Sequence, residues 1–172
     1  MTDPKALAAI LGEDEFTAAM ERFAGSFDAY RGKLPHIPYA YTRTRLFRAP
    51  HFEIVVMQWS AGSTSPIHDH GSSRCWVLML EGALEVDNFE CDEPARGGIV
   101  TLRETGSLVL NRGDIDHRLT PNELHRVHNR TNENAYSLQL YAAPIDTYSV
   151  VDSHSLQSRT VTALCDLELD RD

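Results

Sequence analysis

The sequence predicts a mainly β protein, a jelly-roll β-barrel that follows a short helical segment at the N-terminus. From residue 39 onward, short apolar or alternating runs recur at intervals of roughly 8–12 residues, and Gly, Pro and Asn residues separate them. This spacing is typical of an antiparallel sandwich or barrel, and a double-sheet jelly roll closes such a set of strands. Over residues 14–23 the apolar residues instead recur with helical spacing. We therefore expect residues 1–172 to form one domain, with a helical prefix over residues 1–35 and a β-barrel over residues 39–165.

Length and composition are those of an ordinary globular domain with an acidic surface. The chain has 172 residues, of which 42% are hydrophobic and 24% charged, and its formal net charge is −9. A net charge of this sign argues against nucleic acid or an anionic membrane as a partner. No apolar run approaches the ~18 residues needed to cross a bilayer, and the first residues lack the basic region of a signal peptide. We expect a cytoplasmic protein with no nucleic-acid or membrane partner, and take a monomer as the starting assumption.

The helical prefix is predicted to contain two short helices, over residues 4–11 and 14–23. The second has an apolar stripe at positions i, i+4 and i+7, which can pack against a sheet. Pro35 and Pro38 interrupt any helix in the linker over residues 31–38.

The strands are predicted from apolar runs and from alternation between apolar and polar residues. The longest continuous run, FEIVVMQW, indicates a core strand, and Glu81-Gly82 indicates a hairpin turn. Residues 87–98 are expected to form a loop and residues 104–106 a turn. Strands are expected at residues 39–45, 52–59, 68–70, 76–80, 83–86, 99–103, 107–110, 124–128, 136–141, 147–151 and 160–164.

Three histidines form the candidate metal site. His68 and His70 are two residues apart, so in a strand both imidazoles leave the same face. Polar turn residues on both sides place the pair at a strand end, where an ion and its ligand can enter. In the strand at 124–128, alternation separates His125 from His128, and His125 is the third ligand we choose. The other histidines, at positions 36, 51, 117, 128 and 154, are expected at the surface.

The metal cannot be chosen from the ligands alone. Imidazole suits Zn, Cu, Fe and Ni alike, and three imidazoles would satisfy a zinc ion as well. The set contains no carboxylate, however. A site of this kind can accept an anionic substrate directly on the metal, and a thiolate would supply the missing negative charge.

Polar residues on two further strands are expected to point into the barrel. On the strand at 39–45, Tyr41 and Arg43 share a face, and an arginine in a cavity can bind a carboxylate through two parallel hydrogen bonds. The alternative for Arg43 is a solvated position on an edge strand. On the strand at 136–141, Ser137, Gln139 and Tyr141 share a face.

These residues resemble a known family. The spacing Gly62-x5-His68-x-His70-x4-Cys75-x6-Gly82 is similar to the first cupin motif, with cysteine where most cupins have a glutamate ligand. His125-x3-Asn129 matches the end of the second cupin motif, although its Pro-x-Gly part is not recognisable. Together with Tyr-Thr-Arg43 and Leu-Tyr141-x-x-Pro-x-Asp-Thr, the pattern resembles cysteine dioxygenase over about two thirds of the chain.

The resemblance implies a cupin-type jelly roll and a mononuclear non-haem Fe(II) enzyme. Such an enzyme adds both atoms of O₂ to the sulfur of L-cysteine and gives cysteine sulfinic acid, the second level of thiol oxidation. The implied iron ligands are His68, His70 and His125. Arg43 would hold the substrate carboxylate, with Tyr41 nearby.

The resemblance also implies that Cys75 and Tyr141 can be joined by a thioether and that the Tyr141 hydroxyl points at the iron-bound groups. The family usually has Ser-x-His-x-Tyr in this place, whereas this chain has Ser137-Leu-Gln139-Leu-Tyr141. Glutamine can donate and accept hydrogen bonds but cannot transfer a proton as histidine does.

Two other functions stay open at this stage. One is a dioxygenase for another small thiol acid such as 3-mercaptopropionate. Relatives of that kind have glutamine where Arg43 stands, so the arginine favours cysteine, whereas Gln139 keeps this alternative open. The other is a non-enzymatic cupin whose metal has a structural or sensory role.

Overall fold

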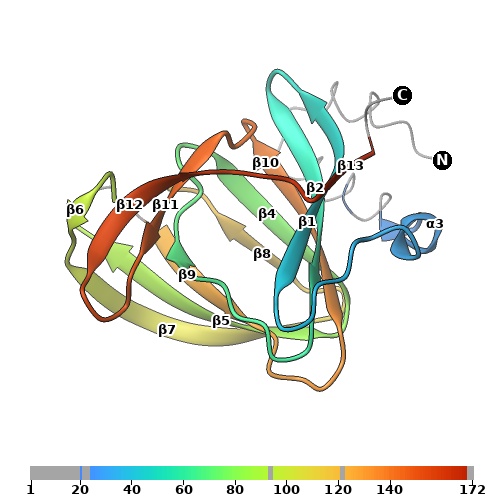
Figure 1. The fold of residues 1–172 in the computed structure, drawn as a ribbon, viewed down its shortest axis with the longest axis horizontal. Helices are drawn as coiled ribbons and strands as arrows, with labels where there is room; N and C mark the ends of the chain where they lie inside the picture. Colours follow the sequence, from blue (N-terminus) through green and yellow to red (C-terminus); the bar gives the residue numbers. More distant parts are fainter. Residues whose placement is uncertain (1–19, 21–23, 93–94, 121–122, 170–172) are drawn as a thin grey trace.

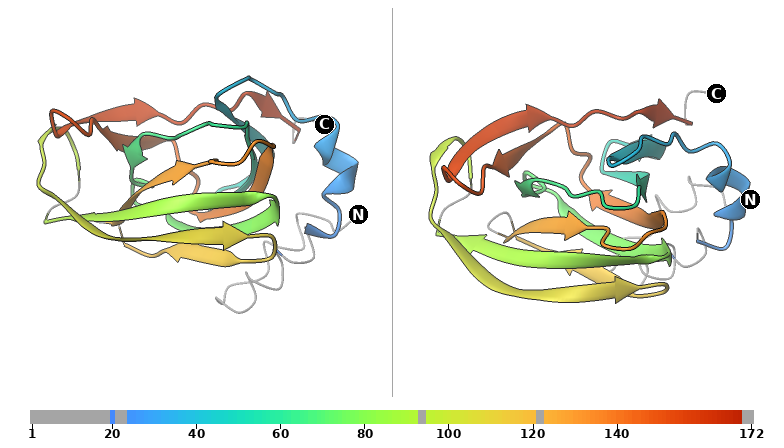
Figure 2. Two further views of the ribbon diagram at one scale, coloured as in Figure 1. Left: turned by 90° about the horizontal axis from the view of Figure 1, so that it is seen from below. Right: turned by 60° about the horizontal axis from the view of Figure 1, so that its bottom comes forward.

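Two β-sheets face each other in the computed structural model, which describes residues 20, 24–92, 95–120 and 123–169 (Figure 1). One sheet has the strand order β13-β1-β2-β10-β4-β8 and the other the order β6-β12-β11-β3-β9-β5-β7. All pairs are antiparallel except β1 with β13. The arrangement is the predicted jelly roll, built in the described residues as two sheets rather than as one closed barrel (Figure 2).

The described elements, in chain order, are α3 (Asp28–Arg31), β1 (Tyr41–Ala49), β2 (Phe52–Trp59), β3 (Ile67–His68), β4 (Arg74–Glu81), β5 (Ala83–Cys91), β6 (Gly98–Ile99), β7 (Leu102–Asn111), β8 (Ile115–Arg118), β9 (Glu123–His128), β10 (Ala135–Ala142), β11 (Thr147–Val151), β12 (Gln157–Thr162) and β13 (Leu167–Glu168). None of the helices in this described part has the length and apolar composition required to span a bilayer.

The central strands of the first sheet are buried on both faces, which explains their continuous apolar runs. All eight residues of β2 are buried. Ile54 and Val56 belong to an outer core that also contains Phe27 and Leu34 from the N-terminal segment. The alternate residues of β2, Val55, Met57 and Trp59, point to the other face and belong to an inner core between the two sheets. The candidate site lies on this inner side.

The N-terminal prediction is tested only in part. The predicted helices at 4–11 and 14–23 lie outside the described residues, apart from Met20, whose side chain is buried in the outer core. The short helix α3 falls within the predicted helical prefix, although no helix was predicted at that position.

The β4–β5 hairpin turns at Gly82, as predicted. Gly82 has a φ of +78°, and a Cβ atom there would lie 2.8 Å from the Cβ of Ala135. Only glycine meets both conditions without strain, because L side chains rarely adopt this backbone conformation.

Two predictions in the second sheet were wrong. The loop predicted at residues 87–98 was placed too early in the chain, because β5 continues to Cys91. The expected turn at 104–106 is absorbed into β7, which pairs with β5 along its whole length. The register shifts between Asn88 and Phe89, so Thr105 is an extra residue on β7 and forms a bulge rather than a turn. The residues around Asp116, which showed no periodicity, form β8 and pair with β4.

The chain crosses from the second sheet to the first near its C-terminus. Residues 163–166, called the crossing segment here, leave β12 and lead to β13, which pairs with β1 (Figure 1). The backbone N–H of Asp166 donates to the Arg43 carbonyl, and the N–H of Arg43 donates to the Asp166 carboxylate, both at 2.8 Å. The crossing segment is therefore fixed beside the inner face of β1.

Candidate metal centre

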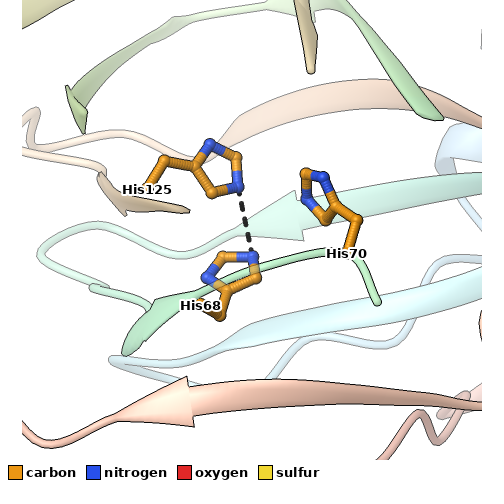
Figure 3. Close-up of side chains that lie close together, drawn as sticks. All are labelled: His68, His70 and His125. Carbon is orange, nitrogen blue, oxygen red and sulfur yellow. Dashed lines mark hydrogen bonds between the residues drawn. The ribbon is translucent and has the colours of Figure 1, made fainter. Parts of the chain in front are cut away.

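His68, His70 and His125 converge between the sheets, with one ligand nitrogen from each within 4.8 Å of the others. Figure 3 shows the three imidazole rings around a common space. The Nε2 atoms of His68 and His125 are 3.2 Å apart. These two residues are also direct partners in the pairing of β3 with β9. The sheet register therefore places the predicted third ligand beside the first.

The loop after β3, rather than a strand, positions His70. The strand ends at His68, so the prediction that both histidines lie on one strand face was wrong. The buried Asp69 carboxylate accepts the backbone N–H groups of Gly71 at 2.9 Å and Ser149 at 2.8 Å, which bends the chain. Gly71 has a φ of +63°, and a Cβ there would lie 2.8 Å from the Thr147 carbonyl oxygen. This turn directs the His70 ring back towards His68.

The three imidazoles are held in the neutral form that binds metal ions. Burial lowers the pKa of His68, and it lowers the pKa values of His70 and His125 well below the usual range. The pKa values of His70 and His125 are lowered further because a proton on either ring would be repelled by a proton on His68 and by the charge of Arg118. Nδ1 of His68 lies 3.0 Å from the Pro66 carbonyl oxygen. A proton on Nδ1 therefore satisfies this contact and leaves the lone pair of Nε2 available to a metal ion.

The separation of His68 and His125 fits two ligands of a single divalent ion. Two imidazole nitrogens bound at right angles to an ion at about 2.1 Å would be roughly 3.0 Å apart, close to the separation of His68 and His125. The cluster contains no carboxylate among the described residues. Three neutral ligands would leave the ion its full charge, so it could bind an anionic ligand.

A cavity of about 300 Å³ opens onto the three histidines. This volume lies at the lower end of the range for small-molecule sites, about 300–1,000 Å³. The crossing segment contributes to its wall. The lining residues are Tyr41, Arg43, Met57, Trp59, Ser65, His68, Asp69, His70, His125, Val127, Gln139, Tyr141, Ile145, Tyr148, Thr162, Ala163, Leu164 and Asp166.

Tyr141 lies beside the histidines and is bound to Gln139. Its ring centroid is 5.6 Å from that of His70, and its hydroxyl donates to Oε1 of Gln139. Burial raises the pKa of Tyr141 well above its usual value, so the phenol keeps its proton at neutral pH. Ser137 accepts a hydrogen bond from Trp59 Nε1 at 3.1 Å. The glutamine therefore takes the place next to the tyrosine that histidine has in the Ser-x-His-x-Tyr pattern.

Cys75 is directly opposite Tyr141 in the pairing of β4 with β10. Directly paired residues in an antiparallel sheet have Cβ atoms about 4.5–5.5 Å apart and point to the same face. The Cys75 side chain is fully buried, and burial raises the pKa of its thiol far above the usual value. The register thus brings the two residues of the expected thioether together.

Arg43 lines the cavity but already has a carboxylate partner that the prediction missed. Nη2 donates to Oε1 of Glu53, and Nη1 donates to Sγ of Cys165 at 3.2 Å. The guanidinium lies 5.6 Å from the centroid of the Tyr141 ring. Burial lowers the pKa of Arg43, but the neighbouring Tyr141 and Glu53 raise it more, so the net shift is upward. The guanidinium is charged and is not a solvated surface group.

Tyr41 packs against Trp59, with ring centroids 4.9 Å apart. Burial and a hydrogen bond with Tyr148 raise the pKa of Tyr41 to about 12. The ring of Tyr148 also contacts His68, with centroids 5.8 Å apart. Tyr148 was missed, because the predicted strand at 147–151 does not show locally which of its faces lines the cavity.

The expectation that His128 lies at the surface was wrong. It is buried, and Nε2 lies 2.9 Å from the Asp87 carboxylate, which also accepts from Arg126. Burial alone would raise the pKa of Asp87, but hydrogen bonds from Arg126 and His128 hold it below its usual value. Nδ1 of His128 lies 3.0 Å from the Thr64 hydroxyl. This network fixes the end of β9, and His128 is not among the residues that line the cavity.

The fold and site define a double-stranded β-helix, or cupin, protein with a three-histidine candidate metal centre. Among solved structures, the chain is similar to a conserved protein with a double-stranded β-helix domain from Klebsiella pneumoniae, with a TM-score of 0.52 and 18% identity over 73% of this chain and 94% of that one. It is also similar to a protein from Thermus thermophilus, with a TM-score of 0.51 and 18% identity over 66% of this chain and 92% of that one. At this identity the likeness shows the fold alone.

Sequence comparison identifies the family within that fold. The family model for cysteine dioxygenase type I matches residues 11–154, and the chain belongs to this family. It is 29% identical to human cysteine dioxygenase type 1 over 151 residues, which are 87% of this chain and 74% of the human protein. It is likewise 29% identical to the Rattus norvegicus enzyme over 161 residues, 90% of this chain and 72% of that protein. Membership indicates a thiol dioxygenase that acts on a small molecule and O₂.

Proposed function

We propose that this protein is a non-haem Fe(II) dioxygenase that adds both atoms of O₂ to the sulfur of L-cysteine and forms cysteine sulfinic acid. The observation that supports this most strongly is the combination of three neutral imidazoles with an arginine in one small cavity. Imidazole nitrogens can hold Fe(II), and the guanidinium can bind the carboxylate of an amino acid.

The bound iron would supply open positions for the substrate thiolate, the substrate amine and O₂. His68, His70 and His125 would be its ligands, and their neutral state means that no proton has to leave when the metal binds. The substrate carboxylate would lie against Arg43, which is on β1 in the cavity wall. Tyr41 would close the same side of the cavity.

Tyr141 is the residue that would meet the reacting groups. Its hydroxyl keeps its single proton at neutral pH and donates it to Gln139, so the hydroxyl would offer its oxygen to the reacting groups as a hydrogen-bond acceptor. Gln139 holds the hydroxyl through Oε1 and so limits the rotation of the C–O–H group. A thioether between Cys75 and the ring would remove the remaining freedom of the side chain and pre-organise the site.

The alternative is oxidation of another small thiol acid, with 3-mercaptopropionate as the example. It is supported by Gln139, which replaces the usual histidine next to the tyrosine. Rates with L-cysteine, 3-mercaptopropionate and cysteamine separate the substrates, because they differ only in the amine and the carboxylate. A higher kcat/KM for 3-mercaptopropionate than for cysteine would favour the alternative.

The metal site is tested by His125→Ala. We expect this variant to bind much less Fe(II) than the native protein and to lose turnover, because two ligands remain in place of three. His51→Ala is the matched control, since His51 is exposed in the β1–β2 turn. Iron content is measured by metal analysis after reconstitution and desalting. Normal iron content and activity in His125→Ala would remove this residue from the proposed site.

A further inference from the structure

Arg43 forms an ion pair with a buried carboxylate of the same chain, that of Glu53. The Glu53 side chain has no exposed surface, and the Arg43 side chain is 12% exposed. Glu53 is the only charged residue in β2, and its Oε1 accepts from Arg43 and from the Ile145 backbone N–H at 3.1 Å. The positive charge in the cavity wall is therefore largely compensated before any ligand binds.

A row of paired residues fixes Glu53 in this position. Across the first sheet, Arg48 on β1 is opposite Glu53 on β2, and Glu53 is opposite Tyr141 on β10. Tyr141 is in turn opposite Cys75 on β4. Nη1 of Arg48 lies 3.6 Å from Oε2 of Glu53. The carboxylate thus lies between two arginines, and one of them faces the cavity.

We propose that Glu53 is a specificity-determining residue that weakens the selection for thiols with a carboxylate. This inference rests on the proposed function. Both terminal nitrogens of Arg43 already donate within the chain, and a substrate carboxylate bound to their remaining N–H groups would face the Glu53 carboxylate across the same guanidinium. Glu53 would therefore disfavour cysteine relative to cysteamine, which has the same thiol and amine but no carboxylate.

The effect is large enough to measure. Two carboxylates on opposite sides of one guanidinium are about 6 Å apart, and at an effective dielectric constant of about 20 their repulsion corresponds to roughly a hundredfold in affinity. Adjustment of the protein and water reduces this value. We expect a change of at least about tenfold when the negative charge is removed.

Glu53→Gln removes the charge and keeps an oxygen that can accept from Arg43 and Ile145. The matched control is Glu104→Gln, the same change at an exposed position on β7. The Fe(II)-loaded proteins are titrated without O₂, with L-cysteine and with cysteamine, by calorimetry. The measured quantity is the ratio of the two dissociation constants, so general effects on the site cancel. This readout does not depend on turnover.

We expect the preference for cysteine over cysteamine to rise at least tenfold in Glu53→Gln and to stay the same in Glu104→Gln. Glu53→Asp keeps the charge but moves it away from Arg43, and should raise the preference by less; it also serves if the glutamine variant does not fold. If the native protein binds cysteine but the preference for cysteine over cysteamine is unchanged or lower in these variants, the inference about Glu53 is overturned. The proposed function is not affected by that result. If the native protein binds neither thiol, the proposed function fails and the inference fails with it.

Discussion

Replacing Arg43 with alanine should destabilise the protein as well as impair substrate binding. The change leaves the fully buried Glu53 carboxylate with Arg48 at 3.6 Å as its nearest cation. Removing one partner of a buried ion pair costs about 3–5 kcal/mol, because the other charge stays buried without compensation. For a chain of this length each kcal/mol lowers the melting temperature by about 2–4 °C, so Arg43→Ala should melt about 6–20 °C lower.

A second substitution separates stability from recognition. In Arg43→Ala/Glu53→Gln the uncompensated charge is gone, so we expect at least half of the lost stability to return. The double variant still lacks the guanidinium, so its preference for cysteine over cysteamine should not return. Arg103→Ala is the control, because the Arg103–Glu90 pair is exposed and such pairs contribute less than about 1 kcal/mol.

Melting temperatures by differential scanning calorimetry and the cysteine-to-cysteamine ratio of kcat/KM are measured for all variants. If Arg43→Ala melts within about 2 °C of the native protein, the ion pair does not contribute as the structure implies. If the double variant is no more stable than Arg43→Ala, an uncompensated Glu53 charge is not the cause of the loss.

Three other predictions follow from the site. After turnover with cysteine and O₂, the intact mass should fall by about two hydrogen atoms through a bond between Cys75 and Tyr141, and this loss should be absent in Cys75→Ser; an active, fully turned-over sample of unmodified mass contradicts it. Gln139→His should maintain or raise the rate with cysteine at unchanged iron content, whereas a clear loss of activity would mean that the site depends on glutamine. Arg126 and His128 hold the pKa of Asp87 in the folded protein below its value in the unfolded chain. The Asp87 carboxylate therefore stabilises the fold above about pH 4, and this contribution is lost as the pH falls through the pKa of the folded state. Asp87→Asn should therefore flatten the decline in unfolding free energy between about pH 5 and pH 3 in urea titrations, and an unchanged decline would argue against this contribution.

Elements with a strong local pattern were predictable from the sequence. The boundaries of β2 and β11 agree with the prediction, because apolar runs and alternation are properties of a few neighbouring residues. The two-residue strands β6 and β13 could not be found in this way. Each pairs with a strand far away in the chain and has no periodicity of its own.

The residue types of the site were predictable, but their partners were not. The pairing of Cys75 with Tyr141 and of Glu53 with Arg48 depends on the register between strands, which a local pattern does not contain. Glu53 did leave a signal. A single carboxylate within the apolar run FEIVVMQW has to be paired if the strand is buried, and a nearby arginine was the available partner.

His70 shows the same limit at a shorter range. The i, i+2 spacing identified a pair of histidines that the structure brings together, but the strand ends at the first of them. The Asp69 carboxylate, which bonds two backbone N–H groups, brings the second ring into place. Side-chain hydrogen bonds of this kind compete with strand pairing and are not visible in the hydrophobic pattern.

The most direct test of the proposed activity is the amount of sulfinate formed per O₂ consumed by the Fe(II)-reconstituted protein. The measurement uses an oxygen electrode and mass spectrometry of the product, with L-cysteine as the substrate and iron content determined on the same sample. We expect about one iron per chain, and about one cysteine sulfinic acid for each O₂, because both oxygen atoms enter the product. Absence of O₂ uptake by the iron-loaded protein, or O₂ uptake that yields cystine instead of sulfinate, would contradict the proposed function.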